Sequence, residues 1–100
     1  MTFTIDRFHH VNQQICDLAQ KATTLGIRQT YVDTLHMALD HLENHPLDWG
    51  DPEYHTKEPG GLVCHGIVGP LFFRFVVYET QKIVIICDII PSPFSELADP

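Results

Sequence analysis

Residues 62–90, which read LVCHGIVGPLFFRFVVYETQKIVIICDII, decide the fold. They contain three runs rich in Val, Ile and Phe, at residues 62–68, 71–78 and 83–90, separated by a Gly-Pro pair and by the polar tetrapeptide ETQK. Short runs of β-branched and aromatic residues bounded by turn residues are typical of strands. The stretch therefore predicts three antiparallel strands joined as a meander.

The last two of these runs predict a sheet that is apolar on both faces. A symmetric hairpin around the ETQK turn pairs Tyr78 with Ile83. That register places Arg74 opposite Cys87 and on the other face from Asp88. The domain can cover only one face with its own helices, so we expect the second face to be covered by the preceding loop, the C-terminal tail or a partner protein.

The first half of the chain predicts one strand and a helical hairpin. Residues 2–8 alternate between apolar and polar, as in a half-buried strand, whereas residues 9–25 and 27–42 carry apolar residues at helical spacing. Gly26 alone separates the two helices, which predicts an antiparallel pair. Residues 47–61 show no sustained period and are predicted to form a loop. The order β-α-α-β-β-β indicates an α+β fold with the helices packed on one face of a small antiparallel sheet.

The composition limits the class of protein. The 100 residues carry six Lys or Arg against thirteen Asp or Glu, a formal charge of -7. We expect a single domain over residues 1–100, and the negative charge excludes a general nucleic-acid coat because it repels phosphate. Three cysteines without a CxxC pair predict free thiols in a reducing cytoplasm. No apolar run is long enough to cross a bilayer, and the N-terminus lacks a signal-peptide core.

Seven histidines raise the question of a metal site. His41 and His45 are spaced i, i+4, as are His36 and Asp40, so each pair could reach one ion from one helix face. The same histidines would also suit the C-terminal turn of a helix, where the macrodipole favours positive charge. Because no third ligand stands at a fixed offset, neither a specific metal site nor a cofactor is expected.

The cysteines do not indicate nucleophilic catalysis. Cys64 and His65 are neighbours on a predicted strand, so their side chains point to opposite faces and cannot share a proton. Cys64 is predicted to be a buried structural residue, and Cys16 and Cys87 are likewise predicted to be small core residues.

Arg74 is the one cation inside an otherwise apolar strand. In one interpretation, Arg74 has a structural role: it forms a salt bridge, or it lies at the sheet edge with its aliphatic stem buried. In the other, it contacts a phosphate or a partner's carboxylate from an exposed sheet face. A salt bridge or an edge position is the commoner role of such an arginine, and Tyr78, which shares its face, adds some support to contact with a phosphate or a partner. Tyr31 lies in the apolar stripe of its helix and is predicted to be structural, and Trp49 and Tyr54 are predicted to cap the sheet.

Two phrases carry a resemblance to a known family. Residues 42–54, LENHPLDWGDPEY, are similar to the passage L-x-x-x-P-x-x-x-G-x-P-x-Y, and residues 69–79, GPLFFRFVVYE, are similar to the strand G-P-L-x-x-R-Y-x-V. Both passages, with the last strand running into a Pro-Ser-Pro segment, resemble the RelE/ParE superfamily of toxin-antitoxin toxins. The resemblance covers nearly the whole chain.

The resemblance implies a compact β-α-α-β-β-β toxin wrapped by a cognate antitoxin. Some members cleave mRNA in the ribosomal A site and others inhibit DNA gyrase. The ribonucleolytic members hold the scissile phosphate with Lys and Arg on their later strands. The matching residues 62–65 and 85–88 lack these cations, and the tail at residues 94–100 lacks the Tyr or Arg that some relatives use. Arg74 and His65 remain as candidate catalytic residues.

Two hypotheses from different classes follow. The favoured one is a toxin-like component of a type II toxin-antitoxin system that acts mainly by binding an antitoxin, a second copy of itself, or a target on the ribosome or gyrase. The alternative is a ribosome-dependent mRNA endoribonuclease that uses Arg74, His65 and Lys57. The residues expected to bind a partner or target are Arg74, Tyr78, Phe72, Lys57 and Tyr54.

Overall fold

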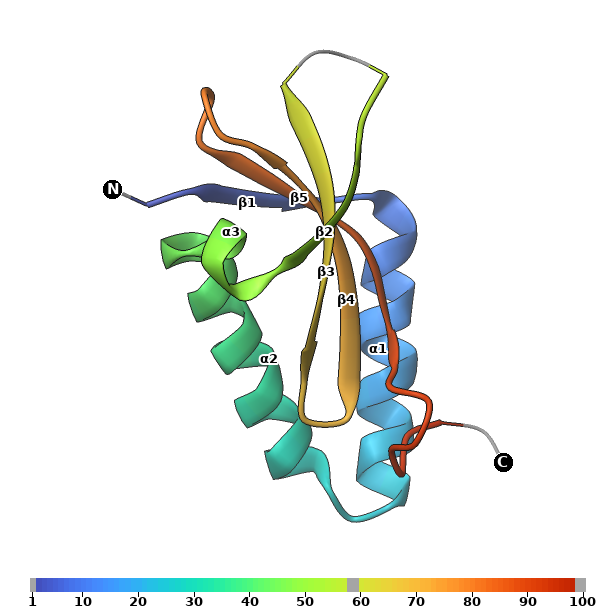
Figure 1. Ribbon diagram of the computed structural model, residues 1–100. Coiled ribbons are helices and arrows are strands. Elements are labelled where there is room, and N and C mark those ends of the chain that lie inside the picture. Colours follow the sequence, from blue (N-terminus) through green and yellow to red (C-terminus); the bar gives the residue numbers. More distant parts are fainter. Residues whose placement is uncertain (1, 58–59, 99–100) are drawn as a thin grey trace.

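A computed structural model describes residues 2–57 and 60–98 of the chain. Parts of the predicted loop, residues 58 and 59, and the last two residues of the tail lie outside this description. Helices and strands follow one another in the order shown in Figure 1: β1 (Thr4–Arg7), α1 (His9–Thr24), α2 (Arg28–Asn44), α3 (Pro46–Trp49), β2 (Asp51–His55), β3 (Gly61–Val68), β4 (Leu71–Tyr78) and β5 (Ile83–Pro91).

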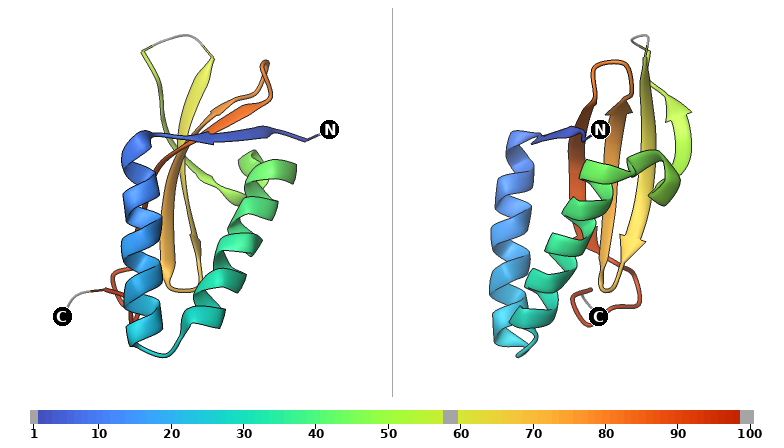
Figure 2. Two further views of the ribbon diagram at one scale, coloured as in Figure 1. Left: turned by 180° about the vertical axis from the view of Figure 1, so that it is seen from behind. Right: turned by 90° about the vertical axis from the view of Figure 1, so that its left-hand side faces the viewer.

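The strands form one mixed sheet in the order β1-β5-β4-β3-β2. β1 is parallel to β5, and the other neighbours are antiparallel, so the predicted meander of the last three strands is confirmed. α1 and α2 run in opposite directions and lie on one side of the sheet, as the edge-on view in Figure 2 shows. Gly26, at φ 75°, makes the left-handed turn between them. The predicted α+β class is confirmed at this coarse level, but the prediction of an antiparallel sheet is wrong for its first strand, because β1 runs parallel to β5.

The prediction of a loop over residues 47–61 is wrong in two places. Pro46 begins the short helix α3, where its fixed φ favours a first helical position. Asp51–His55 forms the edge strand β2, and all five of its residues are exposed. A strand without a buried face shows no alternation of apolar and polar residues, which explains why the sequence pattern did not indicate it.

The predicted pairing of β4 with β5 is correct at the turn and wrong further along. Tyr78 pairs with Ile83, but the register shifts between Arg74 and Phe75, so Arg74 lies opposite Asp88. A β-bulge explains the change, because one extra residue on β5 moves every later side chain to the other face. Arg74 and Asp88 therefore share a face, contrary to the symmetric register.

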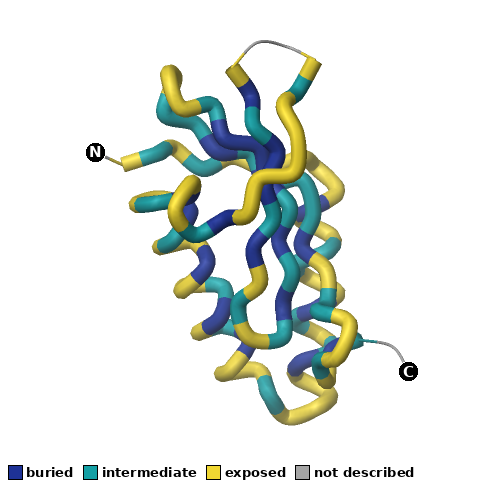
Figure 3. Tube along the Cα trace, viewed as in Figure 1, coloured by how far each residue is buried: buried dark blue, intermediate teal, exposed yellow. Residues whose placement is uncertain are grey.

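The core lies between the helices and the sheet. Figure 3 shows buried positions along the inner sides of both helices and along the central strands. Phe73 and Phe75 on β4 are fully buried there. Trp49 of α3 stacks on Phe75 with ring centroids 5.7 Å apart, and it covers Gly66, where an added Cβ would lie 2.7 Å from the indole. Trp49 thus caps the sheet on its helix side.

The C-terminal tail packs at the end of the sheet. Ser92 donates a backbone hydrogen bond to Pro70 at 2.8 Å, and Leu97 is fully buried in the core. Residues 94–96 lie beside Ile27 and the β3–β4 turn. The tail therefore closes the lower end of the fold in Figure 1. Within the described ranges, no helix combines the length and apolarity needed to cross a membrane.

Two predicted core cysteines lie elsewhere. Cys16 is exposed on α1, and Cys87 is only half-buried. Cys16 falls at the margin of its apolar helix stripe, and Cys87 belongs to the bulged segment of β5, which leaves the regular alternation. Cys64 is fully buried, as predicted.

Tyr31 makes the stability of the fold sensitive to alkaline pH. As predicted, it is buried, and its hydroxyl donates a hydrogen bond to the Ile15 carbonyl at 2.8 Å. Burial, and to a lesser degree the electrostatic interaction with Cys16, raises the pKa of Tyr31 to about 12. The unfolded chain loses this proton near pH 10 while the folded chain keeps it, so stability present below pH 10 is lost as the pH rises through about 12.

We expect urea unfolding to show this alkaline loss, on the order of 1–3 kcal/mol, between about pH 10 and pH 12. Tyr31→Phe should be less stable at neutral pH but should show a shallower loss over the same interval. Tyr78→Phe, on the other side of the sheet, is the matched control. Equal alkaline slopes for wild type and Tyr31→Phe would contradict the assignment.

Candidate functional site

The sheet face turned away from the helices carries the candidate site, and we call it the open face. Strand alternation and the pairing register assign its members. Most are apolar and only partly buried, and Ile67 and Ile90 remain 55% and 40% exposed. β3, β4 and β5 contribute Val63, His65, Ile67, Phe72, Arg74, Val76, Tyr78, Ile83, Ile85, Asp88 and Ile90.

Arg74 and His65 meet at the centre of the open face around one carboxylate. The Arg74 Nε donates to Glu53 Oε2 at 3.1 Å, and His65 Nδ1 lies 3.5 Å from the same oxygen. His65 Nε2 lies 3.7 Å from Asp51 Oδ2. Both carboxylates come from β2, the strand that the sequence pattern did not indicate. The structure thus brings the two predicted catalytic residues together, with acidic partners that the sequence analysis missed.

The pKa of Arg74 reflects this pairing. The hydrogen bond with Glu53 raises the pKa of the guanidinium and outweighs the lowering by partial burial, and the charges of Glu53 and Asp88 add to the rise. A guanidinium bound to one carboxylate and facing another has much of its positive field cancelled. The salt-bridge alternative for Arg74 is therefore the one that the structure contains.

Phe72 forms the floor of this cluster. His65 stacks on its ring with centroids 5.5 Å apart and an interplanar angle of 16°, and the Arg74 guanidinium carbon lies 5.5 Å from the same ring centroid. Stacked and cation–π contacts fix the orientation of both polar side chains. The three residues form one ordered patch.

A shallow cleft of about 360 Å³ adjoins this patch at the upper end of the sheet. Its lining includes Tyr54, Lys57, Arg74 and Tyr78, which are four of the five residues predicted to bind a partner. The fifth, Phe72, lies beside the cleft under Arg74. The predicted binding residues therefore lie on one surface, although they come from the edge strand, the segment after it and β4.

Asp88 is held from the helix side by the start of α1. His10 Nε2 lies 3.2 Å from its Oδ1 and 2.6 Å from the Cys87 carbonyl oxygen, and Gln14 Nε2 donates to the same Oδ1 at 3.1 Å. Gln14 Oε1 accepts a hydrogen bond from the Ile89 backbone N–H at 2.9 Å. These contacts satisfy the backbone at the bulge and fix a carboxylate opposite Arg74. Sequence spacing gives no sign of them, because they join residues more than seventy positions apart.

The thiols of Cys64 and Cys87 are not activated. Cys64 points toward the helices while His65 lies on the open face, as strand alternation predicted. Burial, followed by the charges of Glu53 and Asp51, raises the pKa of Cys64. Burial and Asp88 raise the pKa of Cys87, against a smaller lowering by Arg74. Both thiols therefore stay protonated at neutral pH, where a thiol is a poor nucleophile.

The Arg74 ion pair is expected to contribute little to stability. Its side chains are 40% and 25% exposed, and solvent-exposed ion pairs contribute at most about 1 kcal/mol. We therefore expect Arg74→Ala to lower the free energy of unfolding by about 1 kcal/mol or less in urea titrations. Arg28→Ala, at the exposed start of α2, is the control. A loss above about 2 kcal/mol would show that Arg74 is mainly structural.

Comparisons with known proteins return no relatives: no family model, no curated protein and no solved structure matches the chain. The fold and the site alone therefore define the class of protein. It is a small α+β domain with helices on one face of a mixed sheet and an opposite, partly exposed face that combines apolar, aromatic and paired charged residues. Among the described residues, no group of three or more His, Cys, Asp or Glu is placed to hold a metal ion.

Proposed function

We propose that this protein is a toxin-like component of a bacterial type II toxin-antitoxin system and that it acts by binding a partner protein through the open face. The observation that carries the proposal is that this largely apolar face leaves Ile67 and Ile90 more than a third exposed, although Val63 and Val76 are buried on it, while its central cation is already paired with Glu53. The sequence resemblance to the RelE/ParE superfamily supplies the biological setting, a bacterial cytoplasm.

The charges around Arg74 favour binding over catalysis. A ribonuclease of this kind needs uncompensated cations where negative charge develops on the phosphate. Here Glu53 binds Arg74, Asp88 lies opposite it, and the whole chain carries a charge of -7. A phosphate approaching Arg74 would have to displace Glu53 and would meet further carboxylates, each of which repels it.

The residues of the open face are those that protein interfaces favour. Aromatic residues and Arg are enriched in the centres of interfaces, and truncating them usually weakens binding most. Arg74 lies at the centre of the open face and Tyr78 at its upper end. Phe72 lies toward the lower end, paired with exposed Ile67 and Ile90. The proposed occupant is the cognate antitoxin, and a homodimer is the other outcome that a binding experiment would distinguish.

The proposal is tested by inducing the gene in a bacterial host, with and without the gene beside it. Growth arrest that the neighbouring gene relieves is the expected result. Normal growth on induction of a folded, soluble protein would overturn the toxin assignment. Light scattering of the purified protein, alone and with the neighbour's product, distinguishes a complex with the antitoxin from a homodimer.

One observation favours the alternative of an mRNA endoribonuclease. The cleft gathers two cations, Arg74 and Lys57, with two phenols, Tyr54 and Tyr78, and a cation and a general acid are the groups that phosphodiester cleavage uses. Purified protein added to translating ribosomes would then cleave mRNA, and Arg74→Ala would abolish cleavage. Intact mRNA with the wild-type protein would exclude this alternative.

A further inference from the structure

The end of α2 holds a pair of imidazoles whose nitrogens face each other. His41 Nδ1 lies 2.7 Å from His45 Nε2, and the two rings meet edge to face with centroids 4.9 Å apart. Both side chains are half-buried. Neither residue belongs to the open face or to its cleft, so the proposed function does not use this pair.

The local backbone explains why the two rings converge. His41 is in the last turn of α2, and His45 caps the helix with φ -154° and ψ 60°, which turns its ring back over the preceding turn. Trp49 of α3 lies parallel to the His41 ring, with centroids 5.1 Å apart and an interplanar angle of 14°. Trp49 is in turn stacked on buried Phe75. The core therefore fixes one ring, and the helix cap fixes the other.

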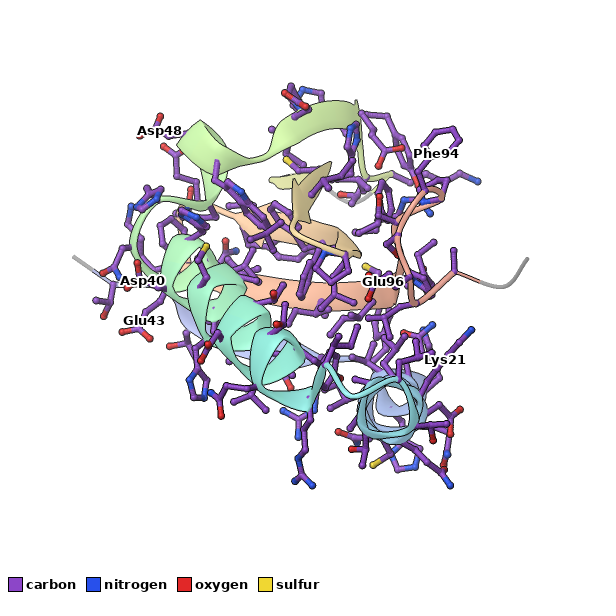
Figure 4. The ribbon with its side chains drawn as sticks, turned by 90° about the horizontal axis from the view of Figure 1, so that it is seen from below. Lys21, Asp40, Glu43, Asp48, Phe94 and Glu96 are labelled. Atoms are coloured by element: carbon purple, nitrogen blue, oxygen red, sulfur yellow. The ribbon has the colours of Figure 1, made fainter. Side chains whose placement is uncertain are left out.

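The surroundings of the pair favour a cation. A cavity of about 230 Å³ lies beside His45 and is lined by Asn44, Asp48 and Glu79. Lys82 also lines it, but its ammonium lies 4.9 Å from the Phe3 ring centroid. In Figure 4, Asp40, Glu43 and Asp48 lie on the same side of the molecule, around the α2–α3 corner. These carboxylates produce a negative potential that raises the local concentration of cations.

We propose that His41 Nδ1 and His45 Nε2 bind one divalent transition-metal ion of the kind that prefers imidazole, such as Zn²⁺, Ni²⁺ or Cu²⁺. The ring that now donates the shared hydrogen takes its other tautomer, so both facing nitrogens present lone pairs to the ion. Metal–nitrogen bonds of about 2.0–2.1 Å at a tetrahedral angle require the two nitrogens to separate from 2.7 Å to roughly 3.3 Å.

The site is open on its outer side. No third protein ligand is in place among the described residues. On the His45 side, the cavity of about 230 Å³ offers room for water, and Asp48 and Glu79 in its lining carry carboxylates that can accept hydrogen bonds from water there. An ion held by two histidines with exchangeable waters is available to a further ligand.

Trp49 makes the proposal directly testable, because it is the single tryptophan of the chain and stacks on His41. Titration of the full-length protein with Ni²⁺ or Cu²⁺ should quench its fluorescence to a plateau at one ion per chain. Zn²⁺, which has no unpaired electrons, should compete and restore the emission. A linear, non-saturating decrease in emission would overturn the proposal.

Substitutions identify the ligands. His45→Gln should weaken the binding at least about tenfold, since the loss of even an outer-shell partner has that effect on metal sites. His36→Gln, on the exposed side of the same helix, should leave the dissociation constant unchanged. Equal affinities for wild type and His45→Gln would refute the site.

A measurement on the unmodified protein covers the case in which His45→Gln does not fold. In ¹⁵N spectra of the seven imidazoles, Zn²⁺ should shift the resonances of His41 and His45 at one equivalent and leave the other five unchanged. Shifts confined to His9, His10, His36, His55 or His65 would overturn the proposal.

Discussion

Replacing Phe75 with alanine is expected to lower the free energy of unfolding by about 3–5 kcal/mol, the usual loss for a buried phenylalanine. Phe75 is fully buried at the centre of β4, and its ring supports Trp49, which covers the helix side of Gly66. Removal of the ring would leave a cavity between the sheet and α3. A domain of this size has a total stability of only about 5–15 kcal/mol, so the variant should be close to unfolding.

Urea unfolding followed by far-ultraviolet circular dichroism measures this loss without depending on the Trp49 signal. Phe94→Ala is the matched control, because Phe94 is fully exposed in the tail and its removal should change the stability by less than about 0.5 kcal/mol. A loss below about 1 kcal/mol for Phe75→Ala would contradict the packing described between Trp49, Phe75 and the sheet.

The parts of the fold that the sequence predicts well are those with a buried face. β4 and the two long helices show their periods because alternate or every third to fourth residue meets the core. β2 is exposed along its whole length, so it has no such period. The bulge in β5 depends on Gln14 and His10 of α1, which satisfy its backbone from a distant part of the chain. Local patterns contain no information about such partners.

The candidate site divides in the same way. Arg74 stands out in the sequence because it is a cation in an apolar strand, and the structure places it on the same surface as Tyr54, Lys57 and Tyr78. Its partner Glu53 could not be predicted, since it lies on the strand that lacks a pattern. The missing partner changes the chemistry, because it turns an apparently available cation into one side of an ion pair.

Replacing Ile67 with aspartate is expected to abolish partner binding while the domain stays folded. Ile67 is 55% exposed on the open face, so the aspartate remains hydrated in the free protein. In a complex that covers this face, the same carboxylate would be buried without a partner, at a cost of about 3–5 kcal/mol. That corresponds to a weakening of binding by about a hundredfold or more.

Met37→Asp provides a matched control. Met37 is 52% exposed on α2, in the helix layer on the far side of the sheet. The two substitutions therefore introduce the same charge at positions of similar exposure on opposite sides of the domain. Unchanged circular dichroism spectra for both variants would show that neither has unfolded.

The most direct test of binding through the open face is the dissociation constant of the complex between this protein and the product of the neighbouring gene, measured by titration calorimetry. We predict that the wild type and Met37→Asp bind equally well and that Ile67→Asp binds at least about a hundredfold more weakly. Unchanged binding by Ile67→Asp, or loss of binding by Met37→Asp alone, would contradict the account.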